Sequence, residues 1–369
     1  MSRLFRSAVL AIAAFGSAVL AQTSTTCNPL NSTCPADEAL GQYADFDFTS
    51  SVTNPSVWNQ TSTPITFGGN GSVFSIAKHG DSPTMNTNFY IMWGSVSVVM
   101  RCSDGPGIVS SIVLLSDDLD EIDWEILGSN KTHVETNYFG KGNTTTYNRA
   151  IYYPVSPSPQ DNFHNYTITW TKDKLEWLID GRSLRTLNYG DALGGQQYPQ
   201  TPMKIYLGAW AAGDPAEPKG VQEWAEATTD YTKGPWTMNV KNVYIQDGST
   251  GAEYSYGDMT GSYQSIKTKA GTSLIVQALN TPIGPGAHWR ALSPATRAGI
   301  IIGSIAGFAL FVLTILFLCI RSTRKGLKEA AKADAEWEAQ QKEAVEWQKR
   351  YNADRASTIG SQKSLAHYR

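Results

Sequence analysis

The stretch Glu121-Ile122-Asp123-Trp124-Glu125 alternates acidic and apolar side chains with a period of two residues. In a β-strand successive side chains point to opposite faces, so the three acids share one face while Ile122 and Trp124 share the other. The apolar face suits a protein core, but three neighbouring carboxylates repel one another and raise one another's pKa values. Packing does not account for them. The pattern therefore predicts a strand whose acidic row (Glu121, Asp123 and Glu125) does chemistry.

The sequence around this strand predicts an all-β domain. Residues 40–247 contain many short runs of strand-forming residues, separated by Gly, Pro, Asn and Asp, without a long amphipathic helix. Asp180-Gly181 between two such runs is a hairpin signal. We expect two stacked antiparallel sheets in a sandwich around one core. Trp170 and Trp177 lie in alternating apolar runs, so we expect both of them in that core.

The two ends of the chain carry targeting signals. Residues 1–21 have the basic start, apolar run and small-residue ending of a signal peptide. Residues 298–320 are apolar, uncharged and long enough to cross a bilayer, and the basic residues that follow place the tail in the cytoplasm. We expect a folded domain at 22–254, a linker at 255–297, a transmembrane helix at 298–320 and a partly helical cytoplasmic tail at 321–369. The domain would then lie outside the plasma membrane.

The composition between the two ends fits an extracellular protein. It carries 17 basic and 26 acidic residues, a net charge of −9, which disfavours nucleic acid as a partner and suits a neutral polysaccharide. We expect a disulfide between Cys27 and Cys34, and a buried free thiol at Cys102. Six Asn-x-Ser/Thr sequons, which are candidate glycosylation sites, all precede the membrane run: Asn31, Asn59, Asn70, Asn130, Asn143 and Asn165.

Paired carboxyl groups are the machinery of glycosidic-bond cleavage. One protonates the leaving oxygen and the other attacks the sugar, at a separation of ~5–5.5 Å in retaining enzymes. Strand residues four apart are ~13 Å apart at Cα, and side chains that lean together bring Glu121 and Glu125 into the retaining range. An inverting separation of ~6.5–9.5 Å stays open. We expect Asp123 to hydrogen-bond its neighbours and hold their titrations apart.

The segment Ser116–Gly128 resembles the active-site strand of glycoside hydrolase family 16, and in detail its fungal Crh branch of cell-wall transglycosylases. The resemblance covers residues 27–256 and includes the segments 136–142, 144–147, 202–203, 208–210, 213–215, 223–225 and 230–231. It implies a concanavalin-like jelly-roll sandwich with a concave cleft, Glu121 as nucleophile, Asp123 as helper and Glu125 as proton donor. It also implies transfer of chitin chains to β-glucan, with possible chitinase activity, and neither a cofactor nor a catalytic metal.

Aromatic side chains in such a cleft supply sugar subsites. Tyr206 and Trp210 are four apart in one expected strand and share a face, which makes them a plausible sugar platform. Val221 stands where many relatives carry a hydroxyl residue. With the proton donor Glu125, the full set of expected substrate contacts is Tyr206, Trp210, Val221, Trp224, Tyr138, Lys141, Arg149 and Tyr231. We expect His164 to be structural.

Two other functions are also compatible with this sequence. A plain endo-hydrolase of β-glucan or chitin would pass the sugar to water instead of to a sugar hydroxyl. A non-catalytic wall sensor would bind polysaccharide and report through the tail, although a lectin needs no acid pair at this spacing. In the Crh branch the C-terminus commonly carries a lipid anchor, whereas the charged tail here predicts a retained protein anchor.

Overall fold

The structure is a computed structural model that describes residues 24–49, 53–61, 63–281, 286, 289 and 292–365, with side chains described up to residue 355. The expected signal peptide at 1–21 lies outside the described residues. The chain divides into a compact unit that ends at Thr281 and a second unit that follows it.

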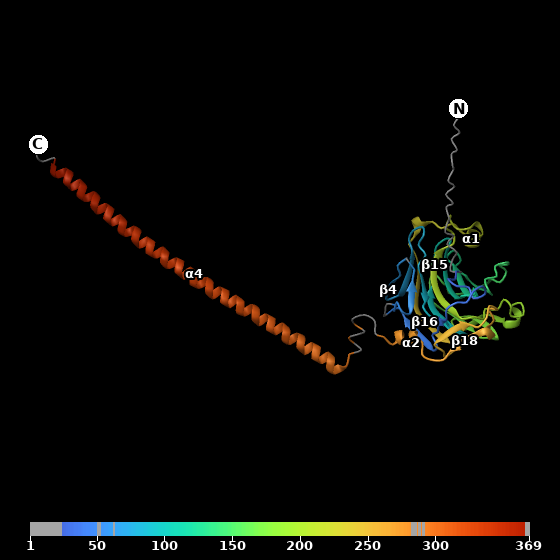
Figure 1. The fold of residues 1–369 in the computed structure, drawn as a ribbon. Helices are drawn as coiled ribbons and strands as arrows, with labels where there is room; N and C mark the ends of the chain where they lie inside the picture. The colour runs from blue at the N-terminus through green and yellow to red at the C-terminus, as the bar shows by residue number, and fades with distance from the viewer. Residues whose placement is uncertain are drawn as a thin grey trace, which may run out of the picture. The chain divides into compact units, whose positions relative to one another are not determined.

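The compact unit is a sandwich of two large antiparallel sheets (Figure 1). One sheet has seven strands, in the order β11 (Ile151–Pro154), β10 (His133–Phe139), β9 (Glu121–Leu127), β8 (Ile108–Ser116), β15 (Met203–Ala211), β6 (Thr84–Thr87) and β3 (Trp58–Gln60). The other has the order β14 (Arg182–Asn188), β13 (Lys174–Ile179), β12 (His164–Trp170), β7 (Gly94–Arg101), β16 (Trp236–Asp247), β5 (Gly71–Ile76) and β4 (Thr66–Gly68), with β2 (Tyr43–Asp47) paired to β16. The predicted jelly-roll class is confirmed.

The core between the two sheets takes the apolar face of β9. Trp124 is fully buried and meets Tyr166 of β12 edge to face, with ring centroids 5.6 Å apart. Trp177 of β13 is also fully buried, and its indole N–H donates to the backbone oxygen of Asp123 at 3.0 Å. Trp170 is fully buried too. Both expected core tryptophans are therefore confirmed, because their strands alternate as the sequence does.

The smaller sequence predictions also have clear outcomes. The Cys27–Cys34 disulfide is present, and Cys102 is a buried free thiol. His164 is buried between the Asp180 carboxylate, 2.7 Å away, and the backbone oxygen of Pro157, 3.0 Å away, which is a structural role. Three sequons present exposed asparagines and three present half-buried ones, in that order: Asn31, Asn59 and Asn70, then Asn130, Asn143 and Asn165.

The expected linker at 255–297 is wrong for its first half. A third sheet joins β1 (Asp37–Glu38), β17 (Glu253–Tyr256) and β18 (Ile266–Lys269), and the short helix α2 (Leu274–Leu279) follows. Ile275 of α2 is buried, and the backbone oxygen of Ala278 accepts a hydrogen bond from the side chain of Asn54 at 2.9 Å. The alternation fades here because β18 is a four-residue edge strand with mostly exposed side chains, so its backbone pairing leaves no period-two pattern.

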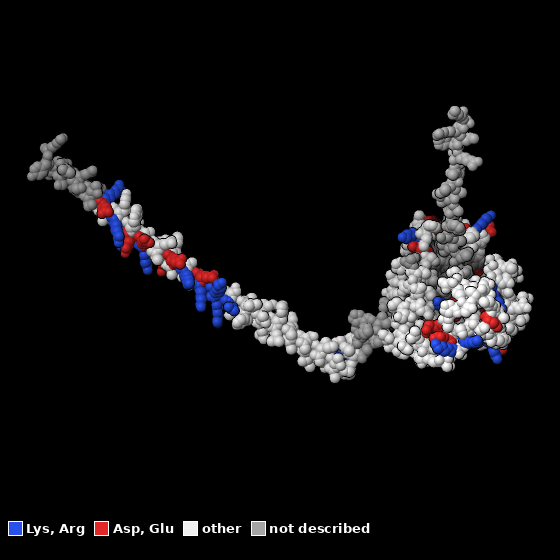
Figure 2. Space-filling view, in the orientation of Figure 1, with Lys and Arg blue, Asp and Glu red and all other residues white. Residues whose placement is uncertain are grey.

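The second unit consists mainly of the long helix α4 (Pro294–Leu365). Its first part is long and apolar enough to cross a membrane. Charged side chains gather on its later part, as the blue and red atoms in Figure 2 show. The expected transmembrane run at 298–320 and the expected tail helix are thus two parts of one helix.

Candidate active site

The acidic row lies on the outer face of the seven-stranded sheet, because the intervening side chains of β9 fill the core. The row is nevertheless recessed. Glu121 is 9% exposed, Asp123 is 2% exposed and Glu125 is half-buried. These three carboxyl groups are largely shielded from water, so the neighbours of each group decide whether it is ionised.

The pKa values of the row are raised unequally. Burial raises the pKa of Glu121 to about 7. For Glu125, burial is again the largest cause, and the facing charges of Glu135 and Glu121 raise its pKa further, well above the usual range, against one hydrogen bond from Trp210. Asp123 is also raised well above its usual range, by burial first and then by its carboxylate neighbours. Burial is therefore the largest cause of the raised pKa at each of the three groups.

A fourth carboxylate, Glu135 of β10, belongs to the site, and sequence reasoning missed it. It is 2% exposed and stands directly opposite Glu125 in the antiparallel register of β9 and β10. The indole N–H of Trp224 donates to Oε2 of Glu135 at 2.9 Å, and the hydroxyl of Tyr152 also donates to this carboxylate. The apolar Val134 followed by the acidic Glu135 indicates a strand with one core face and one polar face. The local sequence does not say which strand pairs with it or in which register, so it does not place Glu135 beside Glu125.

Three of the expected sugar contacts meet at the Glu125 end of the row. Trp210 of β15 and Trp224 of α1 (Lys219–Trp224) stack with ring centroids 5.9 Å apart at an interplanar angle of 20°. Val221, also on α1, packs against a small apolar cluster, and the two indoles pack against that cluster too. The structure therefore brings Trp210, Trp224 and Val221 together beside Glu125.

Tyr206 lies on the same outer face of the seven-stranded sheet, at the level of the middle of the row. In the strand register it is opposite Val113 of β8, and Val113 is opposite Asp123. Residues directly opposite in antiparallel strands point to the same face, so Tyr206 is two strands away from Asp123 on one surface. Its side chain is half-buried, and burial raises the pKa of its hydroxyl.

The expected sugar contact of Tyr138 is wrong. Tyr138 pairs with Ile122, whose side chain is in the core, so it faces away from the acidic row. It is 7% exposed, and its ring packs 6.5 Å from that of Trp177. The strand β10 sends its odd-numbered residues, which include Glu135, to the outer face.

Arg149 and Lys141 hold loops together through hydrogen bonds to backbone oxygens. The guanidinium of Arg149 donates to the backbone oxygens of Tyr138, Asn143 and Thr146, at 3.0, 2.6 and 3.0 Å. The ammonium of Lys141 donates to the backbone oxygen of Thr260 at 2.6 Å. Both cations therefore use hydrogen-bond donors to connect backbone segments that flank the site.

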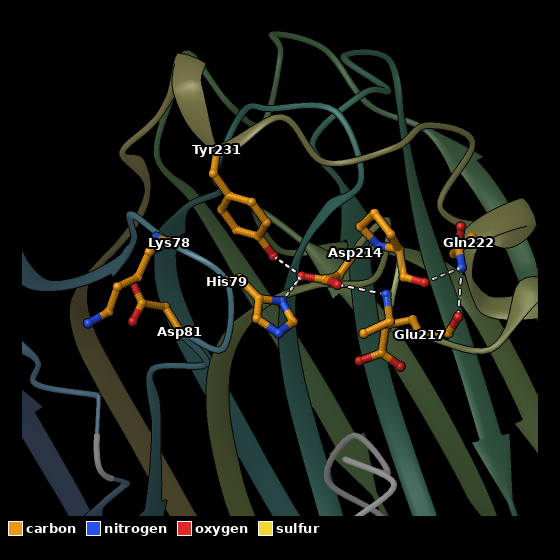
Figure 3. Close-up of polar contacts among 9 residues, drawn as sticks. Lys78, His79, Asp81, Asp214, Glu217, Gln222 and Tyr231 are labelled. Carbon is orange, nitrogen blue, oxygen red and sulfur yellow. Dashed lines mark hydrogen bonds and ion pairs between the residues drawn. The ribbon is translucent and has the colours of Figure 1, made fainter. Parts of the chain in front are cut away.

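Tyr231 belongs to a polar link between loops (Figure 3). Its hydroxyl donates to Oδ2 of Asp214, and Nδ1 of His79 lies 2.6 Å from the same oxygen. Burial opposes ionisation of Asp214, but these partners and the backbone N–H of Ala216 outweigh it and lower the pKa of Asp214. Asp214 raises the pKa of His79 through their hydrogen bond. Because Asp214 lies four residues beyond Trp210, this link fixes the loop that leaves β15.

The described residues include no group of three or more His, Cys, Asp or Glu side chains placed to hold a metal ion. The acidic row supplies carboxyl groups for chemistry. A carboxylate that ionises first, beside a carboxylic acid that keeps its proton, can attack an electrophilic carbon and protonate the departing oxygen.

Comparison with known proteins gives a consistent result. The family model "Glycosyl hydrolases family 16" matches residues 50–233. "Crh-like protein 2" of Botryotinia fuckeliana is 49% identical over 331 residues, which are 88% of this chain and 73% of the relative. "Crh-like protein 3" of Aspergillus fumigatus is 45% identical over 321 residues, 86% of this chain and 88% of the relative. A solved structure, "Crh5 transglycosylase in complex with NAG", is 52% identical with a TM-score of 0.64 and covers 66% of this chain and 100% of its own.

Proposed function

Because this chain belongs to the glycosyl hydrolases of family 16, with the Crh-like proteins among its relatives, we propose that it is a retaining transglycosylase of the fungal cell wall. Its donor is chitin and its acceptor is β-glucan. The solved relative bears the name of a transglycosylase and was solved with N-acetylglucosamine, the sugar unit of chitin, which supports this donor.

The observation that carries the proposed mechanism is the geometry of the acidic row: Glu121 and Glu125 lie on one face of β9, both recessed from solvent, with Asp123 between them. With the roles that the family resemblance implies, Glu121 attacks the anomeric carbon as a carboxylate, while Glu125 gives its proton to the leaving glycosidic oxygen. The product is a glycosyl ester on Glu121. Glu125, now ionised, takes the proton of a glucan hydroxyl, whose oxygen attacks the anomeric carbon and frees Glu121. Two inversions retain the configuration.

Asp123 lies between the two glutamates on the same face, and its Oδ1 is buried without a hydrogen-bond partner among the described residues, so the expected hydrogen bond to its neighbours is not seen at this atom. In this proposal Asp123 keeps its proton and donates a hydrogen bond to the carboxylate of Glu121 as it departs in the second step, which favours the ionised form of Glu121. Tyr206, Trp210, Trp224 and Val221 contact the sugar rings in this proposal. The first three supply aromatic faces for the C–H edges of the sugars.

The membrane-length part of α4 supports a location at the plasma membrane. In this proposal residues 298–320 cross the bilayer once, the catalytic domain faces the wall and residues 321–369 lie in the cytoplasm. The basic residues directly after the span, among them Arg321, Arg324 and Lys325, support this orientation.

Transfer is tested with chitin oligomers that carry a fluorescent label, incubated with and without β-glucan. The proposal expects label on the glucan, at a rate that Glu121→Gln abolishes. If wild-type protein only shortens the oligomers while the glucan stays unlabelled, the protein is a hydrolase and the transferase proposal fails. If neither product forms, the sensor hypothesis replaces both.

A further inference from the structure

We propose that Glu135 is a positioning residue of this reaction: its carboxylate, kept ionised opposite Glu125, makes Glu125 retain the proton that the leaving oxygen needs. This inference rests on the proposed function and extends it to the neighbouring strand. It assigns a role to a buried acid that the two-glutamate mechanism does not use.

The geometry pairs two carboxyl groups with two stacked indoles. Glu125 and Glu135 are directly opposite on β9 and β10, and their side chains share the outer face. The indole of Trp210 is hydrogen-bonded to Glu125, and the indole of Trp224 donates to Glu135 at 2.9 Å. Because the two indoles stack on each other, they fix both carboxyl groups in this facing arrangement.

The partners of the two groups are unequal, and this decides which group carries the charge. Burial raises the pKa of Glu135, whereas the Tyr152 hydroxyl, the Trp224 indole and the charge of the buried Arg185 oppose this rise by favouring its ionised form. For Glu125, the hydrogen bond from Trp210 favours the ionised form, and the charges of Glu135 and Glu121 oppose it. Two buried carboxyl groups that face each other do not both ionise readily, so the proton goes to Glu125.

The remaining groups around Glu125 act in the same direction. Its own strand contributes Glu121 and Asp123, both acidic, and β10 contributes Glu135. On the other side, β8 presents the neutral side chain of Ser111 opposite Glu125. Arg185 acts on Asp123 and Glu135. The electrostatic field at Glu125 is therefore that of facing acids, which favours its protonated form.

Glu135 also matters in the second half of the cycle. Once Glu121 is esterified, it no longer carries a charge and no longer raises the proton affinity of Glu125, whereas Glu135 still does. Glu125 has by then given its proton to the leaving oxygen. A carboxylate opposite Glu135 is a stronger base, so it takes the proton of the acceptor hydroxyl more readily.

The test is the pH profile of kcat/KM for Glu135→Gln in the full-length protein in detergent. This substitution keeps the shape of the side chain and removes its charge. The alkaline limb, which reports the acid of the free enzyme, is expected to move down by about one pH unit, while the acid limb stays in place. Glu176→Gln on β13 is the control, since it removes an equal charge next to Lys174 on the other sheet, and its profile is expected to match wild type.

Tyr152→Phe provides a second variant that does not depend on the folding of Glu135→Gln. Tyr152 is 42% exposed, so loss of its hydroxyl leaves the core intact. Without this donor Glu135 binds a proton more easily, and the alkaline limb is expected to move in the same direction by a smaller amount. A profile that falls uniformly without a shift of the alkaline limb, in both variants, would overturn the inference. If Glu121→Gln is inactive in that case, the proposed function still stands; if Glu121→Gln is active, the proposed function fails.

Discussion

In the proposed mechanism Glu125 donates a proton to the leaving oxygen, whereas Glu121 attacks the sugar without donating one. Donors that differ in their need for a proton can separate these two roles. Replacing Glu125 with Gln removes the proton donor but keeps the side-chain volume. We expect the rate on chitin oligomers to fall by about 10²–10⁴-fold, because a general acid contributes that much. With an aryl donor whose leaving group needs no proton, the loss in the first step is expected to be small. Equal losses with both donors, measured by release of the leaving group, would contradict the assignment.

Tyr206 is the sugar-binding candidate whose ring can be tested without disturbing Glu125. Tyr206→Ala is expected to raise KM about 5- to 10-fold, since a stacked ring contributes about 1–1.5 kcal/mol. Tyr206→Phe, which keeps the ring, is the matched control and is expected to stay within about twofold of wild type. The steady-state kinetics of both variants decide the point, and an unchanged KM in Tyr206→Ala would show that the ring only packs.

At the scale of elements, the C-terminal strap (residues 257–281, with β18 and α2) is part of the folded unit. A chain that ends at Tyr256 loses β18, one of the two strand partners of β17, and the buried side chain of Ile275. We expect it to unfold several degrees below a chain that ends at Thr281, since ~1 kcal/mol shifts Tm by about 2–4 °C in a domain of this size. Calorimetry on the two chains compares their Tm values directly. Equal Tm values would contradict the prediction and show that these residues behave as a linker.

Sequence reasoning found the elements whose pattern is local and missed those that depend on pairing. The period-two pattern of Glu121–Glu125 was enough to predict a strand with a core face and an acidic face. The place of Glu135 beside Glu125 depends on the register of β9 and β10, which local sequence does not contain. The same register sends Tyr138 into the core. The sequence pattern did not reveal the C-terminal strap, because an exposed edge strand such as β18 needs no alternation of apolar and polar side chains.

At the scale of the whole molecule, buried carboxyl groups make stability depend on pH. Burial, with help from Asp117, raises the pKa of Asp37 to about 8. Between about pH 4 and pH 8 the folded state holds this proton and the unfolded state does not, so Asp37 makes stability fall as the pH rises, by up to about 1.4 kcal/mol per pH unit. Asp37→Asn removes this contribution. Denaturant unfolding at pH 5 and pH 8 should show a shallower decline in the variant, and identical declines would contradict the prediction.

The division of the chain predicts that catalysis does not need the membrane helix. Residues 22–281 contain the two sheets, the acidic row and the strap, and they form a unit separate from α4. We expect this shortened chain to be soluble and to transfer label to glucan at a rate within about twofold of the full-length protein in detergent. A severe loss of transfer would show that the second unit contributes to the reaction.

The proposed mechanism depends on a glycosyl ester on Glu121, and trapping this ester tests the mechanism directly. In Glu125→Gln an aryl chito-oligosaccharide with a good leaving group can load the enzyme without an acid, while the missing base slows the second step. Mass spectrometry of the digested protein is then expected to show the oligosaccharide attached to the peptide that contains Glu121, at Glu121 itself. An aryl group released without any adduct, or an adduct on another residue, would contradict the account.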